Sequence, residues 1–94
     1  MKTIWKYEIA PTDIQLIDLP RGAKILCVTM QKSVPYIYAL VDEEEENIEQ
    51  RELFTMGTGH SINIDDSNTR LDYIGTYQMM MGSLVFHLFE RVVI

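Results

Sequence analysis

Residues 35–41 read Pro35-Tyr36-Ile37-Tyr38-Ala39-Leu40-Val41. This run of β-branched, aromatic and aliphatic residues is typical of a β-strand. Successive side chains of a strand point to opposite faces, so Tyr36 and Tyr38 share one face and Ile37 lies on the other. Proline has no N–H to donate to a neighbouring strand, so we expect Pro35 at the start of this strand or on a sheet edge.

Six further segments show the same enrichment and are bounded by glycine, proline or polar turn residues. They predict strands over residues 3–9, 14–19, 23–31, 51–56, 72–78 and 84–91. Seven short strands at a spacing of roughly ten residues predict an all-β fold, either a small antiparallel sandwich or a small barrel. The chain has 94 residues, so we expect residues 1–94 to form a single domain.

The segment 23–31 is apolar on both faces at its centre. This pattern predicts a central strand that is covered on both sides. Cys27 lies inside the run, so we expect it to be buried as a small hydrophobic residue. It is the one cysteine of the chain, which excludes an internal disulfide and indicates a reducing compartment.

The ends and the apolar runs of the sequence bear on its location. The opening residues are too polar for a secretory signal, and no stretch reaches the ~18 apolar residues that a membrane-spanning helix needs. We therefore expect a cytoplasmic protein with no membrane partner.

The acidic residues are unevenly distributed. There are 14 acidic and 8 basic residues, and the formal net charge is −6. Between Asp42 and Glu52 there are seven acidic residues with Arg51 as the sole base, so this segment carries the whole excess. We expect a solvated acidic loop over residues 42–50. Outside this segment the acidic and basic residues are equal in number. That balance argues against a nucleic-acid polymer as partner, but it is compatible with a small anionic ligand.

The most suggestive short motif is Gly57-Thr58-Gly59-His60. Its glycines allow the backbone to approach a ligand closely, and adjacent amides of such a loop can hold an anion. The alternative is a turn that simply ends a strand. The motif matches neither a phosphate-binding loop nor a dinucleotide fingerprint.

Catalytic and metal-binding patterns are weak in this sequence. The two histidines have no further ligands at metal-site spacing, so we expect no metal and no cofactor, and we expect His87 to be a half-buried strand residue. No serine has the surroundings of a nucleophile. An enzyme, for example a nucleotide hydrolase that uses His60 with Asp65, Asp66 or Asp72, is the least favoured hypothesis.

The aromatic residues number nine, which is more than a small core can bury completely. Tyrosine and tryptophan suit interfaces because one end of the side chain tolerates water. The pattern is consistent with ordinary core packing, with a homo-oligomer interface, or with an aromatic shelf for a ligand.

Six stretches of the sequence fit one further pattern. They are Met1-Lys2-Thr3-Ile4-Trp5-Lys6-Tyr7, Leu19-Pro20-Arg21-Gly22-Ala23-Lys24-Ile25-Leu26, Ala39-Leu40-Val41-Asp42, Gly57-Thr58-Gly59-His60, Tyr73-Ile74-Gly75-Thr76 and Phe86-His87-Leu88-Phe89-Glu90. With them the chain resembles a family of small, functionally unassigned proteins of tailed phages and prophages. It departs from that family at residues 79–81 and in the glutamate run. The resemblance implies an infected bacterial host, where small phage proteins often counter defences and one class sequesters nucleotide immune signals.

The leading hypothesis is a non-enzymatic, homo-oligomeric binding protein that captures a nucleotide-like signal. A base would stack on Trp5, Tyr36 or Tyr38, and the phosphates would meet the 57–60 loop and Arg70 or another cation. The candidate site residues are therefore Trp5, Tyr36, Tyr38, Gly57, Thr58, Gly59, His60 and Arg70. The other candidate cations are Arg21, Lys24, Arg51 and Arg91. The alternative hypothesis is an inhibitor or adaptor of a host protein that uses an aromatic face.

Overall fold

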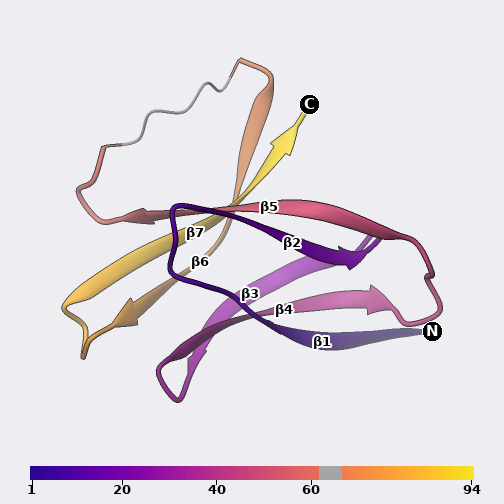
Figure 1. Cartoon of the computed structure of the whole chain (residues 1–94), viewed down its shortest axis with the longest axis horizontal. Coiled ribbons are helices and arrows are strands. Elements are labelled where there is room, and N and C mark those ends of the chain that lie inside the picture. The colour runs from indigo at the N-terminus through magenta and orange to yellow at the C-terminus, as the bar shows by residue number, and fades with distance from the viewer. Residues whose placement is uncertain (62–66) are drawn as a thin grey trace.

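The structure, a computed structural model, describes residues 1–61 and 67–94. Those residues form seven strands and no helix (Figure 1). The strands are β1 (Lys2–Glu8), β2 (Ile14–Pro20), β3 (Lys24–Gln31), β4 (Val34–Asp42), β5 (Ile48–Gly57), β6 (Thr69–Met79) and β7 (Leu84–Val93). The all-β class and each of the seven predicted strands are confirmed, with ends that differ by at most three residues. No part of the described chain forms a helix that could cross a membrane.

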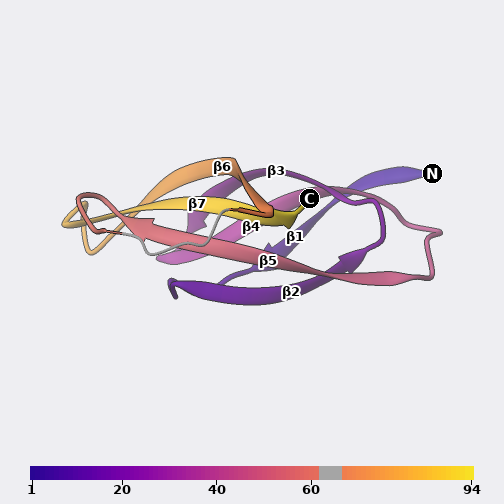
Figure 2. The ribbon, with the colours of Figure 1, turned by 90° about the horizontal axis from the view of Figure 1, so that it is seen from above.

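The strands form two antiparallel sheets that pack in a sandwich-like arrangement. The three-stranded sheet has the order β1-β4-β3, and the four-stranded sheet has the order β2-β5-β7-β6. The molecule is flat, with extents of 40 × 37 × 15 Å, as the side view in Figure 2 shows. Each sheet therefore turns one face toward the shared core and one face outward.

The core lies between the inner faces of the two sheets. Its largest cluster joins Ile37 of β4 to Leu53, Tyr77 and Leu88 of the four-stranded sheet. Burial alternates along the whole of β4, with Ile37 and every second residue buried, as the sequence pattern predicts for a strand with one face on a core. Pro35 lies at the start of this strand, as expected.

The prediction of a central, fully covered strand at residues 23–31 is wrong. β3 is the edge of its sheet, and β4 is the centre. A β-bulge shifts the register between Ile25 and Cys27, so Leu26 is an extra residue in the strand. The bulge leaves Ile25 and Val28 against the core, whereas Cys27 is exposed rather than buried.

The acidic loop is shorter than predicted. β5 begins at Ile48, so residues 48–50 belong to a strand and the loop covers residues 43–47. The carboxylate of Glu49 accepts hydrogen bonds from the Gly22 amide and from Arg51, and these bonds hold this part of the acidic segment in place. A run of like charges predicts a loop, whereas the bond from Gly22 to Glu49 joins residues far apart in the sequence and leaves no local signal.

Candidate functional site

The structure places the predicted aromatic shelf on two different faces. Paired residues of neighbouring strands share a face, and Trp5 pairs with buried Ala39 whereas Tyr38 pairs with Lys6. Trp5 is therefore on the inner side of the three-stranded sheet, and Tyr36 and Tyr38 are on the outer side. A single base cannot stack on Trp5 and on the tyrosines together.

The 57–60 motif is a turn that ends β5. Gly59 has a φ of +82°, and the amide of His60 donates to the carbonyl of Gly57 over 3.1 Å. A Cβ on Gly57 would lie 2.6 Å from Nδ1 of His60, so the imidazole of the turn itself covers this glycine. His60 and Gly57 line a cavity of about 420 Å³ together with Asp13 and Thr55.

Thr58 turns away from that cavity. Its hydroxyl lies 2.7 Å from Nε2 of His87, and the other ring nitrogen of His87 lies 3.0 Å from the hydroxyl of Thr76. His87 is half-buried on β7, as the sequence predicted. These contacts occupy both nitrogens of the ring, which leaves it no free nitrogen for a ligand.

Arg70 lies far from the turn. It pairs with Val92 at one end of the four-stranded sheet, whereas Gly57 pairs with Phe86 near the other end. Six residues of β7 separate these positions, or about 20 Å at the ordinary rise of a strand. The guanidinium of Arg70 also binds Asp72, at 2.6 and 3.0 Å. The structure therefore does not bring Arg70 to the Gly57–His60 turn.

The hydrolase hypothesis combines His60 with Asp65, Asp66 or Asp72, and the structure does not bring Asp72 to His60. Asp65 and Asp66 lie outside the described residues. Asp72 pairs with Glu90 on the ladder, about 13 Å along the sheet from the residues beside the turn. The hydrogen bond from Arg70 lowers the pKa of Asp72 and engages its carboxylate. Within residues 1–61 and 67–94, no cluster of His, Cys, Asp and Glu could hold a metal ion.

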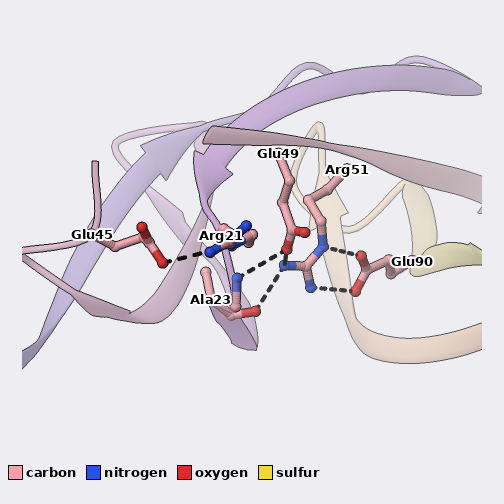
Figure 3. A network of polar contacts seen from close by, with 7 residues as sticks. Arg21, Ala23, Glu45, Glu49, Arg51 and Glu90 are labelled. Atoms are coloured by element: carbon pink, nitrogen blue, oxygen red, sulfur yellow. Dashed lines mark hydrogen bonds and ion pairs between the residues drawn. The ribbon is translucent and has the colours of Figure 1, made fainter. Parts of the chain in front are cut away.

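Arg51 is the centre of a charged network that joins β5 and β7 to the connection between β2 and β3 (Figure 3). Its guanidinium forms a two-pronged pair with Glu90, binds Glu49 at 3.0 Å, and donates to the carbonyl of Ala23 over 2.8 Å. The bond with Glu90 raises the pKa of Arg51 above its ordinary value. A cavity of about 620 Å³ opens beside this network.

Each of the four arginines has a carboxylate partner. Besides Arg51 and Arg70, Arg91 binds Glu52 at 3.1 Å and Arg21 lies 3.8 Å from Glu45. A phosphate at any of these positions would have to compete with a carboxylate that is already in place. The arginines expected to serve as phosphate ligands are therefore engaged within the chain.

The four lysines differ from the arginines in this respect. Lys2, Lys6, Lys24 and Lys32 form no ion pair with any residue that the structure describes. All four belong to the three-stranded sheet or to its β3–β4 turn. Lys2, Lys6 and Lys24 pair with outward-facing residues of β4, and so they share the outer face with the two tyrosines. We call this surface the lysine–tyrosine face: Lys2, Lys6, Lys24, Tyr36 and Tyr38.

Lys6 is the central cation of the lysine–tyrosine face. Its ammonium lies 4.6 Å from the ring centre of Tyr36 and donates to the side-chain carbonyl of Gln31 over 2.9 Å. It is also the ladder partner of Tyr38. Lys24 is among the cations expected from the sequence, but Lys6 is not. The period of two along residues 2–6 could have placed Lys2 and Lys6 on one face.

A second uncovered surface lies on the four-stranded sheet. Ile14 of β2 pairs with Phe54 of β5, Phe54 pairs with Phe89 of β7, and Phe89 pairs with Tyr73 of β6. These four residues, which we call the aromatic row, cross the sheet from edge to edge on its outer face. The rings of Tyr73 and Phe89 are 5.4 Å apart, a favourable spacing for a tilted aromatic pair.

Comparison with known proteins places the chain in a family. A family model described as a domain of unknown function (DUF7352) matches residues 1–93. The chain belongs to the DUF7352 family. Comparisons with curated proteins and with solved structures gave no match. Membership of DUF7352 assigns no activity, so the function has to be argued from the two uncovered faces.

Proposed function

We propose that this chain is a non-enzymatic binding protein whose ligand is nucleotide-like, that is, an aromatic base next to a phosphate. The observation that carries the proposal is the division of the basic residues. Every arginine is paired with a carboxylate, whereas Lys2, Lys6 and Lys24, which form no ion pair with a described residue, share the lysine–tyrosine face with two tyrosines. Although the chain is acidic overall, three lysines without a carboxylate partner among the described residues thus lie on the same face as the two tyrosines.

The chemistry of this face suits both parts of such a ligand. Tyr36 and Tyr38 are side by side on the central strand, and stacking of a base on an aromatic ring contributes about 1–3 kcal/mol. A base that stacks on Tyr36 would displace the Lys6 ammonium from the ring. Lys6 could then bind the adjacent phosphate, and Lys24 could bind it from the other flanking strand.

Charge limits the size of the ligand. The net charge of −6 repels a long polyanion, since the affinity of nucleic-acid polymers depends on many phosphate contacts. The three outward lysines share their face with Glu8 and Asp42, so the positive patch is small. These features favour a mononucleotide, a cyclic dinucleotide or a very short single strand.

The resemblance to phage proteins supplies a setting for this activity. In an infected bacterium, a protein that holds a nucleotide signal would counter a defence that depends on that signal. The alternative role, an inhibitor or adaptor of a host protein, would use the aromatic row instead. It predicts that a stoichiometric host protein, and no small molecule, is retained on purification.

Calorimetry with the purified chain tests the proposal. The panel would contain mononucleotides, cyclic dinucleotides, ADP-ribose derivatives and short single-stranded oligonucleotides, so that free and polymeric sources of the same chemistry are separated. We expect Tyr36→Ala, Tyr38→Ala and Lys6→Gln each to weaken binding by about tenfold. Tyr73→Ala and Arg70→Gln are the matched controls, because they make the same kinds of change on the other sheet.

Two results would overturn the proposal: no member of the panel binds, or the control variants weaken binding as much as the variants of the lysine–tyrosine face. Turnover of a panel member that His60→Ala abolishes would overturn its non-enzymatic part.

The exposed thiol of Cys27 gives a direct footprint of the face. Cys27 pairs with Tyr38, which pairs with Lys6, so the three residues form one row across the sheet. A ligand on the tyrosines would slow the modification of Cys27 by a maleimide. Equal labelling rates with and without a ligand that calorimetry detects would place that ligand elsewhere.

A further inference from the structure

The outer face of the four-stranded sheet has no covering layer within the described chain. Ile14 and Tyr73, at the two ends of the aromatic row, are 55% and 60% exposed, and Leu16 beside them is 59% exposed. Phe54 and Phe89, at the centre of the row, are half-buried. Contiguous apolar surface of this kind marks an interaction site in a soluble protein.

The residues that flank the aromatic row are arranged across the sheet in a particular order. The next row reads Leu16, Glu52, Arg91 and Leu71 from β2 to β6. Its two ends are leucines, and its two central residues are an acid on β5 and a base on β7. The Glu52–Arg91 pair leaves this row with no net charge, so a second copy of the face would not be repelled.

This order is self-complementary under one symmetry operation. Consider a twofold axis that runs parallel to the strands, above the face and midway between β5 and β7. It places each β5 residue over the β7 residue of the same row in the other copy. Phe54 then lies over the partner's Phe89, Glu52 lies over the partner's Arg91, and the apolar ends meet one another. The two charged residues that the central strands carry on this face, Glu52 and Arg91, thus each face a residue of opposite sign, which makes the face self-complementary, as an isologous interface requires.

The available area is that of a small, weak interface. The two central strands run side by side over about eight residues, and the two flanking strands overlap over about five, which gives about 400 Å² per copy and about 800 Å² in total at ordinary strand spacing. An area of this size is typical of transient complexes, so we expect a dimer that dissociates at micromolar concentrations or above.

We infer that two copies of this chain associate through the outer face of the four-stranded sheet, with the aromatic row at the centre of the interface. The inference is independent of the proposed ligand, because it uses the other sheet. Such a dimer leaves the lysine–tyrosine face of each copy open.

Sedimentation equilibrium of the full chain tests association. The expected result is a monomer–dimer equilibrium, against a monomer mass of 10.9 kDa. Leu16→Asp should weaken dimerisation at least tenfold, because it buries a carboxylate against the partner's Leu71. Ile4→Asp is the matched control, since Ile4 is 56% exposed on the other sheet, and it should leave dimerisation unchanged. Two results would overturn the inference: a chain that stays monomeric at about 100 μM, or equal weakening of dimerisation by both variants.

A charge exchange tests the position of the axis. Glu52→Arg alone places two arginines in the row and Arg91→Glu alone places two acids there, so each variant should be monomeric. Mixed together, the two variants should form a 1:1 heterodimer, because each acid of one then faces an arginine of the other. The double variant E52R/R91E should dimerise by itself. Circular dichroism of each variant confirms that it is folded, and folded variants that fail to form the heterodimer would contradict the proposed axis.

Discussion

A Cβ on Gly75 of β6 would lie 2.8 Å from Cγ1 of Val28 on β3. The edge strands of the two sheets therefore come into contact at this pair. A register shift lies beside it in each strand, between Ile25 and Cys27 in β3 and between Tyr73 and Gly75 in β6. Bulges increase strand twist and bend the chain, and here they allow two edges to meet.

Replacement of Gly75 by alanine should reduce the free energy of unfolding by about 1–3 kcal/mol, because the new methyl group overpacks the contact with Val28. Urea denaturation followed by tryptophan fluorescence measures the effect. In a Val28→Ala background, where the valine methyl groups are absent, the same replacement should cost less. An equal cost in both backgrounds would show that the contact with Val28 is not the cause.

Two hydroxyl groups in the core have no hydrogen-bond partner of ordinary geometry within the described residues. They belong to Tyr77 and Thr55, which are 3% and 5% exposed. Replacing unpaired buried hydroxyls by apolar groups of the same shape is neutral or stabilising. We expect Tyr77→Phe and Thr55→Val to keep or raise the melting temperature. A loss of more than about 1 kcal/mol from either variant would show that its hydroxyl is paired.

Tyr77 also predicts a dependence of stability on alkaline pH. Burial raises the pKa of Tyr77 above its ordinary value of 10.0. Above pH 10 the unfolded chain releases the phenol proton while the folded chain keeps it, so this contribution to stability falls as the pH rises toward the folded pKa. The free energy of unfolding of Tyr77→Phe minus that of the unsubstituted chain should therefore increase as the pH is raised from about 8 to about 11. A constant difference over this range would contradict the prediction.

Removal of the acid that pairs with Arg51 should be costly. The Glu90 carboxylate is 12% exposed and accepts two hydrogen bonds from Arg51, so Glu90→Gln leaves a largely buried guanidinium short of its partner. We expect a loss of about 1–3 kcal/mol in the free energy of unfolding. Asp72→Asn breaks the exposed pair with Arg70 and should change stability by less than about 1 kcal/mol. Similar losses from the two variants would mean that burial does not set the strength of these pairs.

The β3–β4 hairpin contains a correctable strain. Gln31 pairs with Val34, so the loop has two residues, and Lys32 and Ser33 adopt φ values of 51° and 67°. Asn-Gly is the preferred sequence for such a loop because both residues accept positive φ at low cost. The double replacement Lys32→Asn and Ser33→Gly should raise stability by about 1 kcal/mol. Ser33→Ala, which retains a Cβ, should give no gain, and a gain from it would show that φ is not the source of the strain.

The local pattern of the sequence determined a large part of this protein. Alternation with a period of two is a property of each segment alone, and it correctly predicted the seven strands and the division of β4 into a face with Tyr36 and Tyr38 and a face with Ile37. The glycine turn after β5 and the half-buried His87 followed from the same local signals. These features need no information from distant residues.

The tertiary structure decided which side chains meet, because strand register, bulges and ion pairs join residues far apart in the chain. One bulge exposed Cys27, and a single ladder partner put Trp5 on the opposite face from Tyr38. Pairing with carboxylates engaged every arginine, whereas three lysines that form no ion pair with a described residue share the outer face of the three-stranded sheet with the tyrosines. The aromatic row likewise draws one residue from each of four strands. Composition counts charges and rings, but only the register of the sheets sets which of them share a face.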